Sequence, residues 1–250
     1  MSNIIQITDL HLIENAAQTY KDVSPYNQLL KAIDSIEAHF PGEKIIIATG
    51  DLVSDMTPKT YDLLKDVFKK INAPVYVIPG NHDDAELVKQ RLVAENISQE
   101  KEIYLNNWLI ILLDSSAPGT VEHSGRLSEP ELLRLQTLLS NNKDKNVIVA
   151  IHHPPLLFGA KFFQPMCLEN RDEFNKIVQA EKNVKAVIFG HAHTQSVILA
   201  KGKLYICAPS TWRQVEHQIE GAHALNKMCG GYNWYKLNED ATLEFGTYYF

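Results

Sequence analysis

The segment Ile45-Ile46-Ile47-Ala48-Thr49-Gly50-Asp51 reads as a buried β-strand that stops at a glycine and a carboxylate. A run of β-branched residues, apolar on both faces, is typical of a parallel strand that is covered on both sides. In an open α/β sheet, ligands bind just beyond the carboxyl ends of the strands, which is where Asp51 stands. The segment therefore predicts an α/β fold with a polar site at this edge of a sheet.

The same design recurs four more times along the chain. The apolar runs 4–8, 75–78, 147–151 and 184–189 each read as a strand. Metal-type side chains follow these runs, namely Asp9 and His11; Asn81, His82 and Asp83; His152 and His153; and His191 and His193. Residues i and i+2 of an extended segment point the same way, so the pairs 9/11 and 191/193 can each face a common site. We expect the strand ends to deliver these side chains to one place.

The remaining segments predict helices between the strands and a more β-rich end of the chain. Amphipathic or capped segments predict helices at 25–40, 57–71, 85–95, 128–139 and 171–181. Residues 101–106 and 108–114 read as a hairpin, and 154–167 as an active-site loop. After His193, the segments 196–200, 204–208, 232–237 and 242–248 predict antiparallel strands of a second sheet. One compact domain spanning 1–250, with two packed sheets flanked by helices, fits this pattern best.

Composition limits the possible classes of protein. Of the 250 residues, 45% are hydrophobic and 22% charged, as in ordinary soluble enzymes, and the net charge is −6. This charge argues against nucleic-acid binding through a broad basic surface, but it allows a small anionic substrate because bound metals reverse the local field. The cysteines Cys167, Cys207 and Cys229 form no CxxC and predict reduced thiols. No signal peptide or 18-residue apolar run is present, so we expect a cytoplasmic protein without a membrane span.

Each polar motif is ambiguous when it is taken separately. Asp9-x-His11 is compatible with a turn that carries a surface histidine, and Gly50-Asp51 with any βα turn. Gly80-Asn81-His82-Asp83 is compatible with an Asn turn, and spacing does not decide whether His152 or His153 is a ligand. The informative signal is joint, because five elements at predicted strand ends appear in the order D-x-H, G-D, G-N-H-D, H-H-P-P and G-H-x-H.

This ordered pattern resembles the calcineurin-like binuclear metallophosphoesterases, in particular their class III cyclic-nucleotide phosphodiesterase branch. The similarity extends over nearly the whole chain and includes residues 6–9, 48–52, 127–129, 209–211 and 231–232. The resemblance implies a four-layer αββα sandwich of two mixed sheets. It also implies that Asp9, His11 and His193 hold one metal, that Asn81, His152 and His191 hold the other, and that Asp51 bridges both.

The implied ligand set is chemically coherent. Carboxylate and amide oxygens with four imidazoles and no thiolate suit Fe or Mn, with Zn or Co as further possibilities. Two such ions about 3.5–4 Å apart would clamp an in-line displacement at phosphorus, and a bridging water would lose its proton near neutral pH to attack the phosphorus. The substrate would contact Asn81, His82 and His193.

His82 is the predicted catalytic residue besides the metal ligands. It follows Asn81 directly, and as imidazolium it would either bind a phosphoryl oxygen or protonate the departing alkoxide. Asp55 is a candidate for orienting His82. Trp212 and the aromatic segment 158–163 would stack a nucleobase or, alternatively, only pack the core. The other histidines, at 39, 123, 217 and 223, match no motif and predict surface or loop positions.

Three functions are compatible with the sequence. The first is hydrolysis of cyclic 3',5'-AMP to the nucleoside monophosphate. The second is the same chemistry on a glycerophosphodiester or on a broad range of diesters, which His-His-Pro-Pro favours because related glycerophosphodiesterases share it. The third is a non-catalytic scaffold of the same fold, against which the presence of all seven implied ligands and His82 argues. The sequence does not indicate the oligomeric state.

Overall fold

Two six-stranded mixed sheets form the centre of the computed structural model, which describes residues 2–119, 121–217 and 230–250. The first sheet has the order β14-β13-β1-β2-β3-β4 and the second β11-β12-β10-β9-β6-β5. The first contains β1 (Ser2–Ile7), β2 (Lys44–Thr49), β3 (Val75–Ile78), β4 (Ile97–Ser98), β13 (Gly231–Leu237) and β14 (Leu243–Tyr249). The second contains β5 (Glu102–Leu105), β6 (Trp108–Leu112), β9 (Asn146–Ala150), β10 (Val184–Phe189), β11 (Ser196–Ala200) and β12 (Lys203–Cys207).

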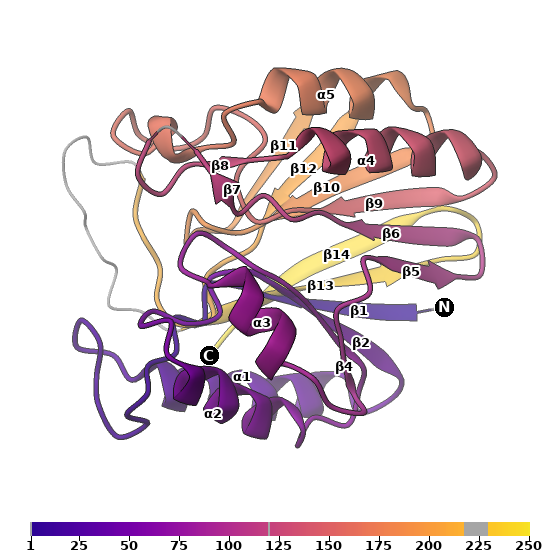
Figure 1. Ribbon diagram of the computed structural model, residues 1–250. Coiled ribbons are helices and arrows are strands. Elements are labelled where there is room, and N and C mark those ends of the chain that lie inside the picture. The colour runs from indigo at the N-terminus through magenta and orange to yellow at the C-terminus, as the bar shows by residue number, and fades with distance from the viewer. Residues whose placement is uncertain (1, 120, 218–229) are drawn as a thin grey trace.

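Helices cover the outer face of each sheet, as Figure 1 shows. Helices α1 (Pro25–His39), α2 (Pro58–Phe68) and α3 (Ala85–Arg91) flank the first sheet. Helices α4 (Glu129–Asn141) and α5 (Arg171–Ala180) flank the second. A short ribbon of β7 (Ala117–Pro118) and β8 (Gly125–Arg126) and a 3₁₀ turn at Gln164–Met166 complete the described elements. The predicted αββα sandwich is therefore confirmed.

Three apolar layers hold these elements together. One lies between α1–α3 and the first sheet, and one lies between α4, α5 and the second sheet. The third lies between the two sheets, where Ile4, Ile47, Ile148 and Ile188 are all buried. This pattern explains why the central strands are apolar on both faces, since one face packs on helices and the other on the opposite sheet.

Several helix starts agree with the sequence signals. The hydroxyls of Ser24, Thr57 and Ser128 accept hydrogen bonds from the backbone N–H three residues later, and a proline follows each cap in the first turn. Within the described residues, no helix has the length and apolar character needed to span a membrane.

The expectation that the last four predicted strands are antiparallel strands of a second sheet is confirmed only in part, because they divide between the two sheets. Strand β12 pairs parallel with β10, and β11 pairs antiparallel with β12, so both extend the sheet that carries β9 and β10. Strand β13 instead pairs antiparallel with β1, with Tyr235 opposite Ile4. The alternation of apolar and polar residues in these segments predicts strands but does not identify the strands with which they pair. The partner is set by which sheet edge is still free to form hydrogen bonds.

Candidate metal centre

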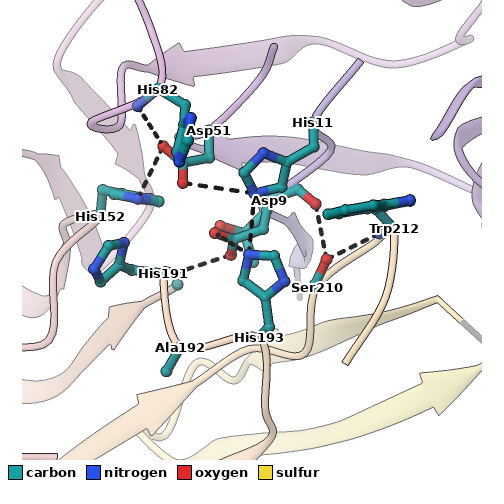
Figure 2. A network of polar contacts seen from close by, with 12 residues as sticks. Asp9, His11, Asp51, His82, His152, His191, Ala192, His193, Ser210 and Trp212 are labelled. Atoms are coloured by element: carbon teal, nitrogen blue, oxygen red, sulfur yellow. Dashed lines mark hydrogen bonds and ion pairs between the residues drawn. The ribbon is translucent and has the colours of Figure 1, made fainter. Parts of the chain in front are cut away.

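The loops that follow β1, β2, β3, β9 and β10 meet at one end of the two sheets (Figure 2). Because β1 and β2 are parallel with Ile7 beside Ala48, their carboxyl ends reach the same level. Strands β9 and β10 are likewise parallel in the other sheet. The polar residues after the first sheet therefore face those after the second.

The backbone is strained at several of the predicted ligands that follow these strands. Five non-glycine residues predicted as ligands occupy the left-handed region, with φ of 53° at Asp9, 49° at His11, 50° at Asp51, 67° at His191 and 49° at His193. Each such residue costs about 1–3 kcal/mol and persists only where the surroundings demand it, commonly at functional sites.

Asp51 occupies the middle of the cluster and is almost completely buried. Its Oδ1 accepts a hydrogen bond from the His82 backbone N–H at 2.9 Å and lies 3.3 Å from His152 Nε2. Its Oδ2 lies 3.7 Å from His11 Nε2. The two oxygens of one carboxylate thus face two different groups of side chains.

The first group joins Asp51 with Asp9, His11 and His193, whose ligand atoms all lie within 4.8 Å of one another. His193 Nε2 is 3.3 Å from Asp9 Oδ1 and 3.0 Å from His11 Nε2. His193 Nδ1 donates to the Arg213 carbonyl at 2.9 Å. In the neutral ring this leaves a lone pair on Nε2, directed at the carboxylates and suited to a cation.

The second group contains Asn81, His152 and His191. His152 Nδ1 donates to the Thr49 carbonyl at 2.7 Å, which directs Nε2 toward Asn81 Oδ1 at 3.3 Å and toward Asp51. Neither ring nitrogen of buried His191 has a hydrogen-bond partner in residues 2–119, 121–217 and 230–250. Two unsatisfied nitrogens in a buried ring are expensive, and a bound cation would satisfy one of them.

His153 lies behind His152 rather than beside Asp51. It is buried, its Nδ1 is 2.8 Å from Ser115 Oγ, and its ring centroid is 4.8 Å from that of His191. Together with His152 and His191 it forms a cluster whose ligand atoms are within 4.8 Å. The contacts with Asp51 and Asn81 belong to His152, however, which favours His152 as the ligand.

The carboxylates and imidazoles strongly perturb one another's pKa values. Burial would raise the pKa of the Asp51 carboxyl, but His152 and His11 outweigh it and keep this pKa well below its usual range. Burial would lower the pKa of His152, but Asp51 and Asp9 raise it to about 9. Burial dominates at His11 and lowers its pKa to about 3. A neutral His11 has one ring nitrogen with the free lone pair that a metal ligand needs.

His82 stands at the open side of the centre. Its ring makes an edge contact with His11, with centroids 4.9 Å apart, and stacks on His123 at 5.1 Å and 16°. Burial lowers the pKa of His82 from its ordinary value. The backbone bond to Asp51 fixes the position of this imidazole relative to the cluster.

The suggestion that Asp55 orients His82 is wrong. The two Asp55 carboxylate oxygens accept hydrogen bonds from the Glu14 backbone N–H at 2.8 Å and from the Thr60 hydroxyl at 2.6 Å, so both bind partners other than His82. Asp83 is the carboxylate that supports this region. It accepts from the N–H groups of Leu52, Val53 and Gly80, and burial raises its pKa to about 7. It therefore ties the loop after β2 to the loop after β3.

A cavity of about 440 Å³ opens from the cluster. Its lining beyond the predicted ligands and His82 includes Tyr20, Lys21, His123, Phe163, Met166, Trp212 and Val215. The Trp212 ring stacks on Tyr20, with centroids 5.0 Å apart, and makes a tilted contact with His11 at 5.1 Å. Phe158 packs against Phe189 in the core at 5.8 Å. Base stacking by these aromatics stays a prediction.

Two of the four histidines assigned to the surface or loops belong to this region. His123 accepts a hydrogen bond from Asn81 Nδ2 at 3.2 Å, and His217 donates from Nε2 to the Ala192 carbonyl at 2.7 Å. Neither stands in a recognisable motif, so no spacing signal points to them. His39 stacks on Tyr248 at 4.0 Å, away from the cluster. Cys167 and Cys207 are free buried thiols as predicted, whereas His223 and Cys229 lie outside the described residues.

Sequence comparison identifies named relatives over almost the whole chain. A 3',5'-cyclic-nucleotide phosphodiesterase of Nostoc sp. is 31% identical over 96% of this chain and 89% of its own length. A 3',5'-cyclic adenosine monophosphate phosphodiesterase of Vibrio vulnificus is 29% identical over 98% and 88%. A probable glycerophosphodiester phosphodiesterase of Arcobacter nitrofigilis is 32% identical over 85% and 79%.

Comparison of structures and of family profiles agrees with this result. A dimetal phosphatase from Danio rerio superposes with a TM-score of 0.68 at 16% identity, covering 95% of this chain and 93% of that one. The profile of the calcineurin-like phosphoesterases matches residues 2–195, which include all the strand ends described above. The chain therefore belongs to the calcineurin-like phosphoesterase family.

Proposed function

We propose that this chain is a binuclear-metal-dependent phosphodiesterase that hydrolyses cyclic 3',5'-AMP to the nucleoside monophosphate. The observation that carries the proposal is the position of Asp51, whose two carboxylate oxygens face two separate groups of metal-type side chains. Relatives that match nearly the full chain and are named cyclic-nucleotide phosphodiesterases support the choice of substrate.

The side chains fit a pair of metal ions. Asp9, His11 and His193 would hold one ion, Asn81, His152 and His191 the other, and Asp51 both. Asp9 Oδ1 and both ring nitrogens of His191 are buried without a hydrogen-bond partner among the described residues, as expected for atoms of metal ligands. Oxygen and imidazole donors favour Fe or Mn, with Zn or Co also compatible.

The protein prepares these ligands through hydrogen bonds to their far sides. The carbonyls of Thr49 and Arg213 accept from the Nδ1 atoms of His152 and His193, which fixes the tautomer in which Nε2 binds. When bound, the ions supply activation of a water and neutralisation of the phosphoryl charge. The water oxygen joins phosphorus, one P–O ester bond breaks, and the departing alkoxide takes up a proton.

His82, Asn81 and His193 would contact the substrate. The His82 ring lines the cavity beside both groups, so it can bind a phosphoryl oxygen or deliver the proton that the leaving alkoxide needs. The cavity beyond it is mainly apolar and aromatic and matches a substrate with one compact anionic group and a flat organic part.

A glycerophosphodiester is the second candidate substrate. The relative named as a probable glycerophosphodiester phosphodiesterase matches 85% of this chain at 32% identity, which is as high as the cyclic-nucleotide relatives. The scaffold alternative lacks a comparable observation and does not account for the buried, unsatisfied atoms of Asp9 and His191, which a bound cation would satisfy.

One parallel assay separates these possibilities. Purified protein with Mn²⁺ is given cyclic AMP, glycerophosphocholine and bis(4-nitrophenyl) phosphate, and Asn81→Ala, His82→Ala and the distant His39→Ala are run beside it. We expect cyclic AMP turnover that Asn81→Ala and His82→Ala abolish and His39→Ala preserves. Turnover of glycerophosphocholine but not of cyclic AMP would favour the second substrate, and no turnover with any metal would refute the proposal.

The same assay defines the role of His82. A nitrophenolate leaves without a proton, whereas the alkoxide of cyclic AMP needs one. If His82 is the general acid, His82→Ala loses much more activity on cyclic AMP than on the nitrophenyl diester. If His82 binds the phosphoryl oxygen, both substrates lose equally.

A further inference from the structure

His123 occupies a position that the proposed mechanism does not use. It stands on the turn between β7 and β8, far in sequence from every predicted ligand, yet it lines the cavity and touches two of the residues that follow β3. Its Nδ1 accepts from Asn81 Nδ2 at 3.2 Å, and its ring stacks on His82 at 5.1 Å and 16°.

The turn that carries His123 is held in place by its own contacts. Glu169 Oε1 accepts from the Val121 N–H at 3.2 Å and the Ser124 hydroxyl at 2.7 Å. The Ser124 N–H also donates to the Val121 carbonyl at 3.0 Å. His123 adopts φ 65°, a left-handed conformation that is uncommon for a residue other than glycine. The His123 ring is therefore presented to Asn81 by a built turn.

The hydrogen bond matters because the Asn81 side chain has two chemically different ends. With Nδ2 donating to His123, Oδ1 faces His152 Nε2 at 3.3 Å, which is the side of the predicted second ion. A flipped amide would direct its N–H groups at that position, and an N–H group cannot bind a cation. The carboxylate of Glu122, 3.7 Å from His123 Nε2, favours the tautomer with its proton on Nε2, which leaves Nδ1 as an acceptor. This acceptor selects the amide orientation that a metal ligand requires.

We infer that His123 is a positioning residue, which orients the Asn81 amide for the second ion through Nδ1 and supports the His82 ring through stacking. This inference rests on the proposed function, because it assumes a cation beside Asn81. Partners behind a metal ligand typically change metal affinity about 10- to 100-fold when they are removed, so the effect is measurable.

Two substitutions separate the two contacts. His123→Phe keeps an aromatic ring over His82 but offers Asn81 no acceptor. His123→Asn keeps an acceptor, tolerates the left-handed backbone and removes the stacking ring. Val121→Ala is the matched control, because Val121 lies on the same turn, is 42% exposed, and makes its contacts with Glu169 and Ser124 through backbone atoms.

The test is a Mn²⁺ titration of chelator-treated protein, in which free Mn²⁺ is followed by electron paramagnetic resonance. We expect His123→Phe to weaken one of two Mn²⁺ equivalents about tenfold or more, and His123→Asn and Val121→Ala to bind like wild type. At saturating Mn²⁺, His123→Asn should lower kcat for bis(4-nitrophenyl) phosphate about 2- to 10-fold, since His82 loses its neighbour.

The outcomes distinguish this inference from the proposed function. If His123→Phe binds both equivalents like Val121→Ala, the positioning role is refuted whatever the enzyme hydrolyses. If the Mn²⁺ affinities change as expected but no phosphodiester is turned over, the proposed function fails and the positioning role stands. Wild-type protein that binds no Mn²⁺ overturns both.

Discussion

Substitution of Gly80 by alanine should damage the metal centre far more than the fold. A Cβ at Gly80 would lie 2.3 Å from Asp51 Oδ1, 2.4 Å from Asp51 N and 2.8 Å from His152 Nε2. These neighbours belong to the predicted bridging ligand and to a ligand of the second ion. The backbone of Gly80 also donates to Asp83 Oδ2 at 2.8 Å, so the glycine itself has little freedom to withdraw.

The size of the effect follows from the geometry. Reaching even a tight 3.0 Å contact from 2.3 Å needs a shift of about 0.7 Å (3.0 minus 2.3) by Asp51 or by Gly80. Overpacking of this kind costs about 1–3 kcal/mol of stability, which lowers Tm by roughly 2–12 °C for a chain of this length. A misplacement near 1 Å at a reacting centre costs about 100-fold in rate, so kcat should fall by about two orders of magnitude.

The assay compares Gly80→Ala with Gly42→Ala, whose added Cβ meets no atom within 4 Å. Both variants are measured for Tm, for bound Mn²⁺ and for kcat on bis(4-nitrophenyl) phosphate. We expect Gly42→Ala to behave like wild type and Gly80→Ala to remain folded with impaired Mn²⁺ binding and turnover. A Gly80→Ala variant with the Mn²⁺ content and kcat of Gly42→Ala would show that the cluster around Asp51 is not the centre of the reaction.

Two further predictions concern the support of the centre and its charge. Gln6→Leu should destabilise the protein by about 1–3 kcal/mol in urea unfolding, since buried Gln6 donates to Thr49 Oγ1 at 2.9 Å and accepts from the Tyr235 hydroxyl at 2.7 Å. An unfolding midpoint equal to that of Asn3→Ala, at a partly exposed position of the same strand, would contradict this. The apparent Mn²⁺ affinity should rise about tenfold per pH unit between pH 6.5 and 8.5, because the His152 imidazole has a pKa of about 9 without metal and must lose its proton to bind. Calorimetric titrations at several pH values check the sign, and an affinity that is flat or falls with pH would exclude His152 as a ligand.

Much of the centre could be predicted because parallel strands end at a common level. The runs before Asp9 and Asp51 are largely apolar, and their pairing as neighbours in one sheet brings the two carboxylates together. The same reasoning holds for the strands before His152 and His191 in the other sheet. Local signals such as Pro25 and Thr57 also predicted the helix starts, because a first-turn proline and a cap each act within a few residues.

What the sequence could not predict depends on contacts between distant segments. His123 approaches Asn81 because Glu169 holds its turn, and no periodicity records that relation. The strands after His193 all show a similar alternation of apolar and polar residues, which does not distinguish one sheet from the other. Their division between the two sheets depends instead on which sheet edge was available for pairing. Asp83, rather than Asp55, supports the loops beside His82, because three backbone N–H groups donate to its carboxylate. These contacts depend on how the loops fold, and the spacing of residues in the sequence does not reveal them.

The division of the predicted ligands between two sheets has a consequence for motion. Asp9, His11, Asp51 and Asn81 follow strands of the first sheet, while His152, His191 and His193 follow strands of the second. Either ion would thus join layers that otherwise meet mainly through aliphatic side chains. Amide hydrogen exchange in β1 and β10 should consequently slow when manganese is added, so metal occupancy would govern how often the two halves of the sandwich separate.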